Sequence, residues 1–408
     1  MKNSDIVAAI DIGSAHIIAA LAAISPTGAI TPLAFAEIPS KGVKKGGIAN
    51  IGLAQHAVDT VLEALQIDGS YHIHSIVASL SGVSIVGHNS DGSVAIRGTP
   101  VCEEDVQRAI SVAKNVALQE GRQLLHILRQ SFILDRQTDI DDPIDLMGER
   151  LTVRVHIISA AKTAYYNLLQ VFSHRDIDVE HVVASGLASM LSVTSHDERQ
   201  LGVCVLDIGA GTTDVTIIHN GQVKHTEVIQ LGGELITNDI AFFMRSTAEN
   251  AEAIKCQIDI CATYDEDDII EIPSVGDVAR RYTTQDVANV ARDRCEQLIE
   301  MIMQKIRRSG VEDIFPGGFV ITGGSANLTG IEQLFMEKTQ LPVRIAKVEV
   351  ALPDSTQTSS RYATIMGLFL CAYEEDYTRT MTNELKTGII SRLSTGLRDL
   401  WQKVLKHF

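Results

Sequence analysis

The sequence predicts an α/β fold in which the same strand-and-turn unit occurs twice. An apolar run that ends in Asp-Ile-Gly appears in A-A-I-D-I-G-S-A at residues 8–15 and again in V-L-D-I-G-A-G-T-T-D-V at residues 205–215. A third apolar run, F-V-I-T at 319–322, enters the turn Gly-Gly-Ser-Ala and is followed by the helical pattern I-E-Q-L-F. Strands that alternate with turns and helices in this way are typical of mixed sheet-and-helix domains.

The composition fits a soluble globular protein with more than one domain. The chain has 408 residues, of which 45% are hydrophobic and 21% are charged. The net charge of −16 excludes a general basic surface, so we expect no nucleic acid as a partner. The six cysteines form no C-x-x-C pair, which favours the reduced thiols of a cytosolic protein.

The first apolar segment, residues 6–24, has two interpretations. Its length and apolar character are compatible with a membrane span or a signal peptide. However, Asp11 and His16 fall in its middle, and Gly13 interrupts it. Two buried strands joined by a polar turn explain these residues better. We therefore expect a cytoplasmic protein without a transmembrane helix.

Apolar residues at steps of three and four predict the helices that follow. These helices are expected over 53–65, from near Glu103, over 162–173 and over 286–309. The acidic residues after Cys102 favour a helix N-terminus at that point.

Three further segments complete the sheet-and-helix pattern. L-T-V-R-V-H-I-I at 151–158 predicts a strand, and V-V-A-S-G-L-A-S at 182–189 predicts a strand, a turn and a helix. The acidic run at 264–268 is more typical of a solvated hairpin loop than of a binding site. Residues 374–388 are polar and lack apolar periodicity, so they predict a linker.

The two Asp-Ile-Gly turns indicate a site for a nucleoside triphosphate and Mg²⁺. Each turn places a carboxylate at the end of a strand, and its glycines let successive backbone N–H groups point at one ligand. The aspartates suit this role if a hydrated Mg²⁺ lies between carboxylate and phosphate. The small residues that follow add hydroxyl donors without bulk, and they are Ser14, Thr212 and Thr213.

Other phosphate-binding motifs do not fit the sequence. Neither turn reads G-x-x-x-x-G-K-[ST], and neither is a G-x-G-x-x-G that opens a long helix, so a P-loop and a Rossmann site are not predicted. The third turn, Gly323-Gly324-Ser325, allows a flat ligand such as adenine to approach the backbone.

The last twenty residues, 389–408, predict an amphipathic helix on a membrane surface. They carry a charge of +3, which leaves −19 on residues 1–388, and they contain the only tryptophan of the chain. The apolar stripe consists of Ile390, Leu393, Leu397, Leu400, Trp401 and Val404, and the cations beside it are Arg392, Arg398, Lys403 and Lys406. The alternative is a terminal helix that packs on the protein itself. The basic face and the preceding linker favour an anionic membrane.

Two Asp-x-Gly turns followed by a Thr-Gly-Gly-Ser turn resemble the actin-like ATPase superfamily. S-K-G-V-K-K-G-G-I-A-N-I (40–51), L-S-G-V-S-I-V-G-H-N-S-D-G-S-V-A-I (80–96), D-D-P-I-D-L-M-G-E-R-L (141–151) and L-G-G-E-L-I-T-N-D-I-A (231–241) resemble the FtsA family of bacterial cell-division proteins. The resemblance implies an actin-like two-domain fold with duplicated sheet-and-helix domains, an inserted 1C subdomain and the C-terminal amphipathic helix. The implied parts are 1–81, 158–198 and 359–373 for subdomain 1A, 82–157 for 1C, 199–235 and 298–358 for 2A, 236–297 for 2B, 374–388 for the linker and 389–408 for the membrane helix.

The resemblance also assigns roles to residues of the site. Asp11 and Asp207 would hold Mg²⁺, through water, beside the phosphates of ATP. The other expected ATP-binding residues are Gly13, Ser14, Gly209, Gly211, Thr212 and Thr213 at the phosphates, Gly232, Gly233 and Glu234 at the ribose, and Gly323, Gly324 and Ser325 at the adenine. His16 and Glu234 depart from the family pattern, in which a small or basic residue and an Asn are more common. No catalytic residue is implied, and slow or absent ATP hydrolysis is expected.

The function implied by the resemblance is that of an adaptor in cell division. Such a protein polymerises on the cytoplasmic face of the bacterial inner membrane, holds the FtsZ ring there and helps to recruit later division proteins to the septum. Its subdomain 2B receives the C-terminal peptide of FtsZ. The alternative is an enzyme of the same superfamily, namely a kinase, a phosphatase or a chaperone-type ATPase. An enzyme needs a second substrate pocket and a base near the γ-phosphate, and no segment of the sequence supplies them.

Overall fold

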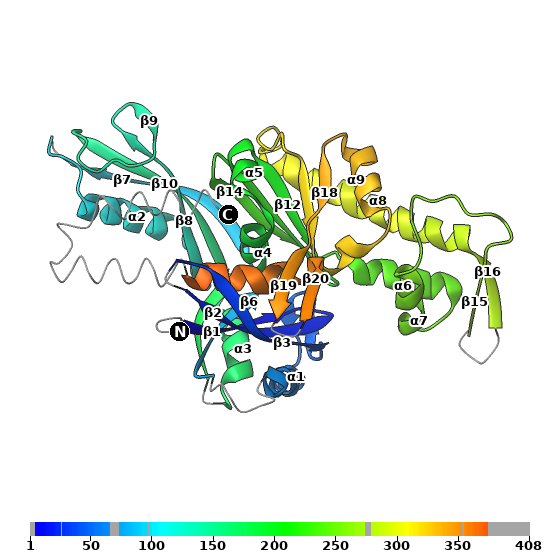
Figure 1. The fold of residues 1–408 in the computed structure, drawn as a ribbon. Coiled ribbons are helices and arrows are strands. Elements are labelled where there is room, and N and C mark those ends of the chain that lie inside the picture. Colours follow the sequence, from blue (N-terminus) through cyan, green and yellow to red (C-terminus); the bar gives the residue numbers. More distant parts are fainter. Residues whose placement is uncertain are drawn as a thin grey trace.

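The computed structural model describes residues 5–25, 27–65, 73–96, 98–175, 177–273, 279–352 and 355–373 (Figure 1). Two five-stranded sheets lie at the centre of the molecule, and a four-stranded sheet lies at one side of it. The predicted linker and membrane helix lie outside the described residues, so their predictions stay untested. Among the described helices, none combines the length and the apolar character needed to cross a membrane.

The two five-stranded sheets have the same topology. In each, three consecutive antiparallel strands are followed by two strands that run parallel to the first. In spatial order, the first sheet contains β3 (Ile30–Pro39), β2 (His16–Ile24), β1 (Asp5–Ile12), β6 (Ser75–Leu80) and β11 (Asp178–Ala184). The second contains β14 (Gln222–Ile229), β13 (Thr213–His219), β12 (Val203–Ile208), β17 (Phe319–Thr322) and β18 (Val343–Ile345). This match confirms the predicted duplication.

The predicted aspartate turns occupy equivalent places in the two sheets. Asp11 is the second-last residue of β1, and Asp207 is the second-last residue of β12. Each strand pairs with an antiparallel neighbour, where Asp11 lies opposite Ile18 and Asp207 lies opposite Asp214. The segment 6–24 is therefore a hairpin of two strands, as predicted.

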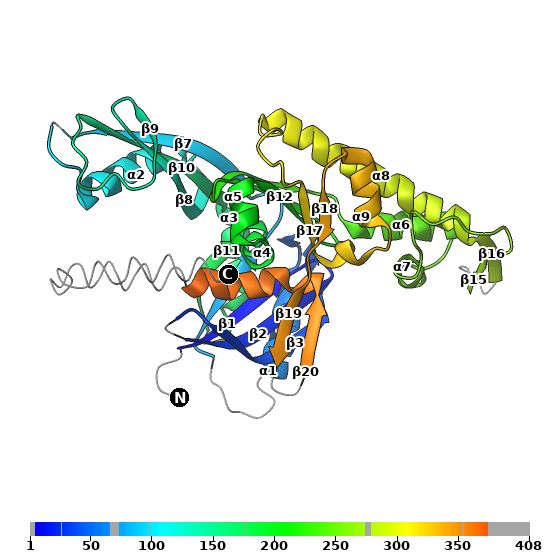
Figure 2. The same cartoon turned by 45° about the horizontal axis from the view of Figure 1, so that its top comes forward.

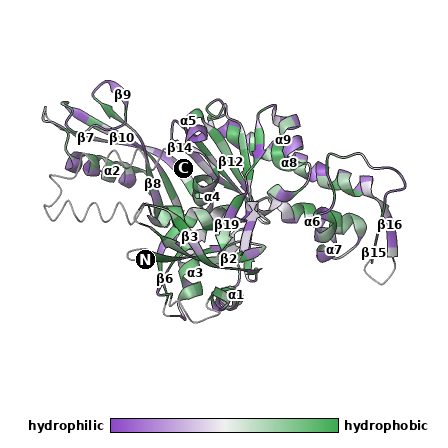
Figure 3. Cartoon of the chain, in the orientation of Figure 1, coloured by the Kyte–Doolittle hydropathy of each residue, from purple (hydrophilic) through white to green (hydrophobic). Residues whose placement is uncertain are grey.

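Helices cover the sheets because their apolar residues recur on one face. In α1 (Ile51–Leu65), for example, Ala54, Val58 and Leu62 are fully buried at steps of four. The other helices of the two central units are α3 (Lys162–Phe172), α4 (Ser185–Val193), α5 (His196–Leu201), α8 (Thr284–Ser309) and α9 (Ile331–Thr339). The predicted helices at 53–65, 162–173 and 286–309 are thus confirmed with small shifts at their ends. Figure 3 shows that the central strands are predominantly hydrophobic.

Two helices cross where the central units meet. α4 follows β11 of the first sheet and leads into β12 of the second, and the helix over 363–373 packs against it. A Cβ at Gly367 would lie 1.9 Å from the carbonyl oxygen of Ala188, so only glycine permits this approach. The predicted turn within 182–189 is absent, because α4 begins directly at Ser185.

An inserted subdomain extends from one side of the molecule (Figure 1). It has its own core, in which Val106 and Ala109 of the helix meet Val153 and Val155 of the sheet. Its sheet order is β7 (Val86–Ala95), β10 (Arg150–Ala161), β8 (Arg122–Leu134) and β9 (Gln137–Ile140), and its helix is α2 (Glu103–Ala117). The predicted helix near Glu103 and the predicted strand at 151–158 are both confirmed.

A second extension lies at the opposite end of the molecule, as Figure 2 shows. It contains α6 (Gly233–Met244), α7 (Ala248–Lys255), β15 (Ile269–Pro273) and β16 (Ala279–Thr283). The acidic run 264–268 is exposed but precedes the β15–β16 hairpin, so the predicted hairpin loop is wrong. The run forms a turn of its own instead, in which the Asp268 N–H donates to the Asp265 carbonyl and the Asp265 N–H donates to Asp268 Oδ2, both at 3.1 Å.

Short elements complete the described structure. They are β4 (Val43–Lys44), β5 (Gly47–Ile48), β19 (Val348–Leu352), β20 (Ser355–Ser359) and the 3₁₀ turns η1 (Gly324–Asn327) and η2 (Ser360–Tyr362).

Candidate functional site

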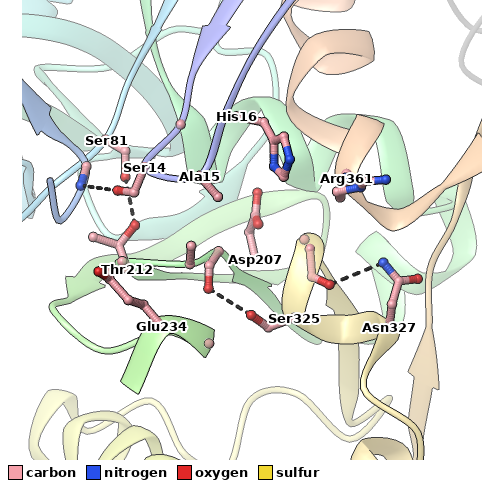
Figure 4. A pocket seen from close by; sticks show the side chains of 18 of the residues that line it. Ser14, Ala15, His16, Ser81, Asp207, Thr212, Glu234, Ser325, Asn327 and Arg361 are labelled. Atoms are coloured by element: carbon pink, nitrogen blue, oxygen red, sulfur yellow. Dashed lines mark hydrogen bonds between the residues drawn. The ribbon is translucent and has the colours of Figure 1, made fainter. Parts of the chain in front are cut away.

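A cleft of about 790 Å³ lies where the two aspartate hairpins face each other. Its walls come from β1–β2 on one side and from β12–β13, α6 and η1 on the other (Figure 4). Most of the predicted site residues line it, namely Asp11, Gly13, Ser14, Asp207, Gly209, Gly211, Thr212, Gly233, Glu234, Gly323, Gly324 and Ser325. The fold therefore gathers three turns that are far apart in the sequence into one site.

Two of the predicted residues do not line the cleft. The Thr213 side chain is fully buried, and its hydroxyl donates to the carbonyl oxygen of Leu231 at 2.8 Å. A Cβ at Gly232 would lie 2.5 Å from the carbonyl oxygen of Ala210. Both residues therefore hold the segment 231–233 against the second hairpin, behind the cleft surface.

Asp11 is held by the neighbouring strand of its own sheet. The Ser79 hydroxyl donates to Asp11 Oδ1 at 2.6 Å and accepts the Ile12 amide at 3.1 Å. Burial raises the pKa of Asp11 to about 7, opposed by the Ser79 hydrogen bond and increased by the negative charge of Asp207. Two carboxylates from opposite halves of the molecule therefore influence each other across the cleft.

Asp207 is held by residues from two helices, one that precedes it in the chain and one that follows it. Ser189 of α4 donates a short hydrogen bond to Asp207 Oδ2, and Thr364 donates to the same atom at 3.2 Å. Burial raises the pKa of Asp207, although both hydrogen bonds oppose the shift. The aspartate is thereby fixed on the helix crossing that joins the two halves.

Asp214 is a third buried carboxylate, and its role was not predicted. It lies opposite Asp207 in the β12–β13 hairpin, and Ser81 donates to its Oδ2 at 3.2 Å. Burial raises the pKa of Asp214 well above its usual value, and the charges of Asp207 and Asp11 add to the shift. Its position as the last polar residue of G-A-G-T-T-D was the available signal.

Glycines make the close contacts between the facing turns possible. A Cβ at Gly211 would lie 2.7 Å from Ser14 Oγ and 2.9 Å from the Cα of Lys45. The Ser14 oxygen accepts the Gly46 amide at 2.9 Å, so the loop after β3 also reaches this point. The Gly211 position therefore meets the opposite half of the protein.

The third turn is fixed to the second hairpin by a side-chain hydrogen bond. Ser325 Oγ donates to the carbonyl oxygen of Gly209 at 2.9 Å (Figure 4). Gly323 has a φ of +88°, a backbone conformation that glycine adopts without strain, and a Cβ there would lie 2.3 Å from Asp207 Oδ1. The turn thus supplies exposed backbone at one end of the cleft.

The same end carries a charged cluster that sequence reasoning missed. Lys255 of α7 is buried, and its Nζ contacts Glu252 Oε2 at 2.6 Å and Thr237 Oγ1 at 2.9 Å. Burial opposes ionisation of Glu252, but hydrogen bonds from Lys255 and Thr237 lower its pKa. The spacing Glu-x-x-Lys on a helix was the available signal, because it places both side chains on one face.

His16 and Arg361 form the opposite wall of this end (Figure 4). Both approach Glu37 of β3, with Arg361 Nη1 at 2.9 Å and His16 Nε2 at 3.9 Å from Glu37 Oε1. The departure from the family pattern at His16 therefore places an imidazole beside an existing ion pair.

The donor set fits a hydrated magnesium ion rather than a directly caged metal. Within the described residues, no group of three or more His, Cys, Asp or Glu side chains is arranged to hold an ion directly. Asp11, Asp207 and Asp214 nevertheless converge with pKa values raised by burial, and the negative charge of Asp207 adds to the shifts of Asp11 and Asp214. A divalent cation near such carboxylates offsets this repulsion, and Mg²⁺ usually keeps several of its waters.

Comparisons with known proteins place this fold and cleft in a class. The chain is similar to a solved structure of MreB5 of Spiroplasma citri bound to ADP, with a TM-score of 0.52 at 16% identity over 93% of this chain and 98% of that one. It is also similar to a chain of the PilM–PilN type IV pilus biogenesis complex, with a TM-score of 0.66 at 15% identity over 90% and 98% of the two chains. The duplicated sheets and the cleft between them define an actin-like fold.

The family follows from the sequence comparisons. The family model "Cell division protein FtsA" matches residues 204–367, and the model "SHS2 domain inserted in FTSA" matches residues 82–159. The cell-division protein FtsA of Pseudomonas aeruginosa is 33% identical over 350 residues, which cover 85% of this chain and 84% of that protein. The chain belongs to the FtsA family, and it is an actin homologue of the bacterial division machinery.

Proposed function

We propose that the cleft binds ATP with Mg²⁺ and that the bound nucleotide joins the two halves of the protein. The facing hairpins carry this proposal, because they present two strand-end carboxylates and small or glycine residues to one space. Asp11 and Asp207 hold Mg²⁺ through water in this proposal. The phosphates lie along Gly13, Ser14, Gly209, Gly211 and Thr212, the ribose near Gly233 and Glu234, and the adenine near Gly323, Gly324 and Ser325.

The protein and the ion have separate parts in this proposal. Mg²⁺ supplies the positive charge that lets triphosphate approach the carboxylates. The Ser14 and Thr212 hydroxyls and the turn amides orient the phosphates, and Gly211 leaves room for the two halves to meet. At the other end of the nucleotide lies the Glu252–Lys255 pair, in which Lys255 is buried and Glu252 is half-exposed.

We also propose that the C-terminal peptide of FtsZ binds where α6 and the β15–β16 hairpin of the second extension meet α8 of the central unit. A groove of about 830 Å³ runs between these elements. Phe242 lines it with 86% of its surface exposed, beside the cations Arg245, Arg280 and Arg294. An exposed aromatic side chain among arginines suits a peptide with both apolar and acidic residues.

The remaining parts of the proposed adaptor concern assembly and the membrane. The inserted subdomain contributes to self-association into polymers, because it projects from the body with a core of its own. Residues 389–408 attach the polymer to anionic lipid on the cytoplasmic face of the inner membrane. Polymer avidity strengthens this attachment, since each tail contributes a modest affinity. Later division proteins are then recruited to the septum.

A pair of binding measurements tests the proposal and separates it from the enzyme alternative. Calorimetry should show ATP binding that requires Mg²⁺. In a sedimentation assay, the full chain should pellet together with anionic vesicles. Rapid phosphate transfer to small acceptors without vesicle binding would favour a kinase or phosphatase instead. A folded protein that shows no ATP binding at all would overturn the proposal.

A further inference from the structure

The inserted subdomain is attached to both halves of the molecule, although the chain connects it only to the first. Its strands β7, β8 and β10 all contact β14, the edge strand of the second sheet (Figure 1). Asn89 Nδ2 donates to the carbonyl oxygen of Lys224 at 3.0 Å, and Gln130 Nε2 donates to that of Val223 at 2.6 Å. The edge of the second sheet is therefore bound through side chains rather than by a further strand.

A buried histidine completes this attachment. His156 of β10 is 1% exposed, and its ring lies between Asn89 Oδ1, 2.7 Å from Nδ1, and Thr226 Oγ1, 2.9 Å from Nε2. Because the Asn89 amide nitrogen donates to Lys224, its oxygen must accept, so Nδ1 carries the proton. Nε2 then accepts from the Thr226 hydroxyl, and every polar group of the ring is satisfied.

His156 keeps the same two hydrogen bonds over the ordinary pH range because its ring does not become charged. Burial lowers the pKa of His156 to about 3, and the nearby charges of His225 and His88 add to the shift. The ring is therefore neutral and keeps its single arrangement. Gly87 permits the contact, because a Cβ there would lie 2.1 Å from Thr226 Oγ1.

The bound strand is the neighbour of the strand that carries a cleft carboxylate. Thr226 lies directly opposite Thr216 of β13, and Thr216 is two residues from Asp214 on the same face of that strand. The path from the carboxylate to the histidine is thus two residues along a strand and one step across a hairpin, about 7 Å and 5 Å respectively.

The root of the inserted subdomain also touches the cleft. Ser81, which directly follows β6 where the chain leaves the first sheet for the inserted subdomain, has its hydroxyl 3.3 Å from the Thr212 hydroxyl and 3.2 Å from Asp214 Oδ2. The subdomain is therefore connected to the phosphate end of the cleft at its root and, through the β13–β14 hairpin, at its side.

We infer that the inserted subdomain reports whether the cleft holds nucleoside triphosphate, because the β13–β14 hairpin transmits movement of the cleft wall to His156 and Asn89. This inference rests on the proposed ATP binding. A ligand that draws the two hairpins together displaces β14 relative to the first sheet. The subdomain follows β14 through these hydrogen bonds, so the surface available for self-association changes with nucleotide.

Hydrogen exchange measured by mass spectrometry on the full chain tests the inference. In the wild type, ATP with Mg²⁺ should change amide exchange both in the β13–β14 hairpin and in β7. Thr226→Val removes the hydroxyl that His156 accepts and keeps the side-chain shape. The hairpin response should remain in this variant, whereas the β7 response should fall at least threefold.

Two further variants keep the test decisive. Thr152→Val is a matched control on β10, because within the described residues the Thr152 hydroxyl bonds only with Ser93, in an exposed pair at 2.7 Å. It should respond as the wild type does. Gln130→Ala removes a more accessible contact to β14 and should also reduce the β7 response if Thr226→Val proves unstable.

The outcomes separate this inference from the proposed function. If calorimetry shows that the wild type binds no ATP, the proposed function fails and the inference fails with it. The inference alone is wrong in two cases. In the first, ATP binds to the wild type but amide exchange in β7 does not change. In the second, amide exchange in β7 changes as much in Thr226→Val and Gln130→Ala as in the wild type.

Discussion

Replacing Asp11 with Asn should stabilise the protein in the absence of nucleotide and abolish binding of ATP with Mg²⁺. The substitution keeps the shape of the side chain, and its amide oxygen can still accept the Ser79 hydroxyl, which donates to Asp11 at 2.6 Å. What it removes is a carboxylate that is buried beside Asp207. The variant therefore separates the energetic cost of the charge from the packing of the residue.

The size of the effect follows from the raised pKa. The pKa of Asp11 has the ordinary value of 3.8 in the unfolded chain and is about 7 in the folded protein, so the folded state binds the proton more tightly. The tighter binding of this proton contributes fully to the free energy of unfolding below about pH 4, and the contribution is lost as the pH rises to about 7. The slope is about 1.4 kcal/mol per pH unit, so the wild type should lose about 3 kcal/mol between about pH 5 and pH 7 relative to the variant.

Urea denaturation at several pH values measures this difference directly. Asp207 and Asp214 titrate in both proteins, so the difference curve reports Asp11 together with its repulsion of these two groups. Calorimetry at about pH 8 then compares ATP binding with Mg²⁺. Parallel stability curves for the two proteins would refute the claim that Asp11 is destabilised by burial, and undiminished ATP affinity would refute its assignment to the magnesium site.

Three further changes test other parts of the proposal. Gly211→Ala places a Cβ 2.7 Å from an oxygen of the opposite hairpin, so calorimetry should show at least tenfold weaker ATP binding, whereas Gly47→Ala, with its nearest contact at 3.7 Å, should bind normally. Trp401→Glu puts a charge into the apolar stripe of the tail, so the protein should no longer sediment with anionic vesicles while ATP binding persists; unchanged sedimentation would show that the tail is not the anchor. Phe242→Ser should weaken binding of the FtsZ peptide at least tenfold in a fluorescence anisotropy titration, whereas Met336→Ser, which removes another exposed hydrophobic side chain outside the groove, should not.

The parts of the site that lie in one turn could be predicted from the sequence. Asp11 with Gly13, and Asp207 with Gly209, stand in local patterns whose chemistry needs no knowledge of the rest of the fold. The duplicated sheets follow from the same repetition, because equivalent turns require equivalent strands. Each turn therefore predicted both its own structure and half of the cleft.

The residues that support the site could not be predicted, because they come from distant segments. Ser79 on β6, Ser189 on α4 and Thr364 near the end of the described chain meet the two aspartates only after the sheets assemble. Their sequence surroundings are ordinary apolar strands and helices. The ion pair of Glu37 with Arg361 joins residues that are 324 positions apart, so no local pattern announces it.

The contact between Gly367 and Ala188 has a mechanical consequence for the whole molecule. Where two helices touch backbone to backbone, sliding one along the other forces carbonyl groups into the opposing chain, whereas rotation about the contact changes few distances. The helix crossing is therefore a pivot about which the two halves of the protein can rotate. Thr364 and Ser189 attach Asp207 close to it, so a small rotation there barely moves this aspartate while it carries the outer end of the second half through a much longer arc.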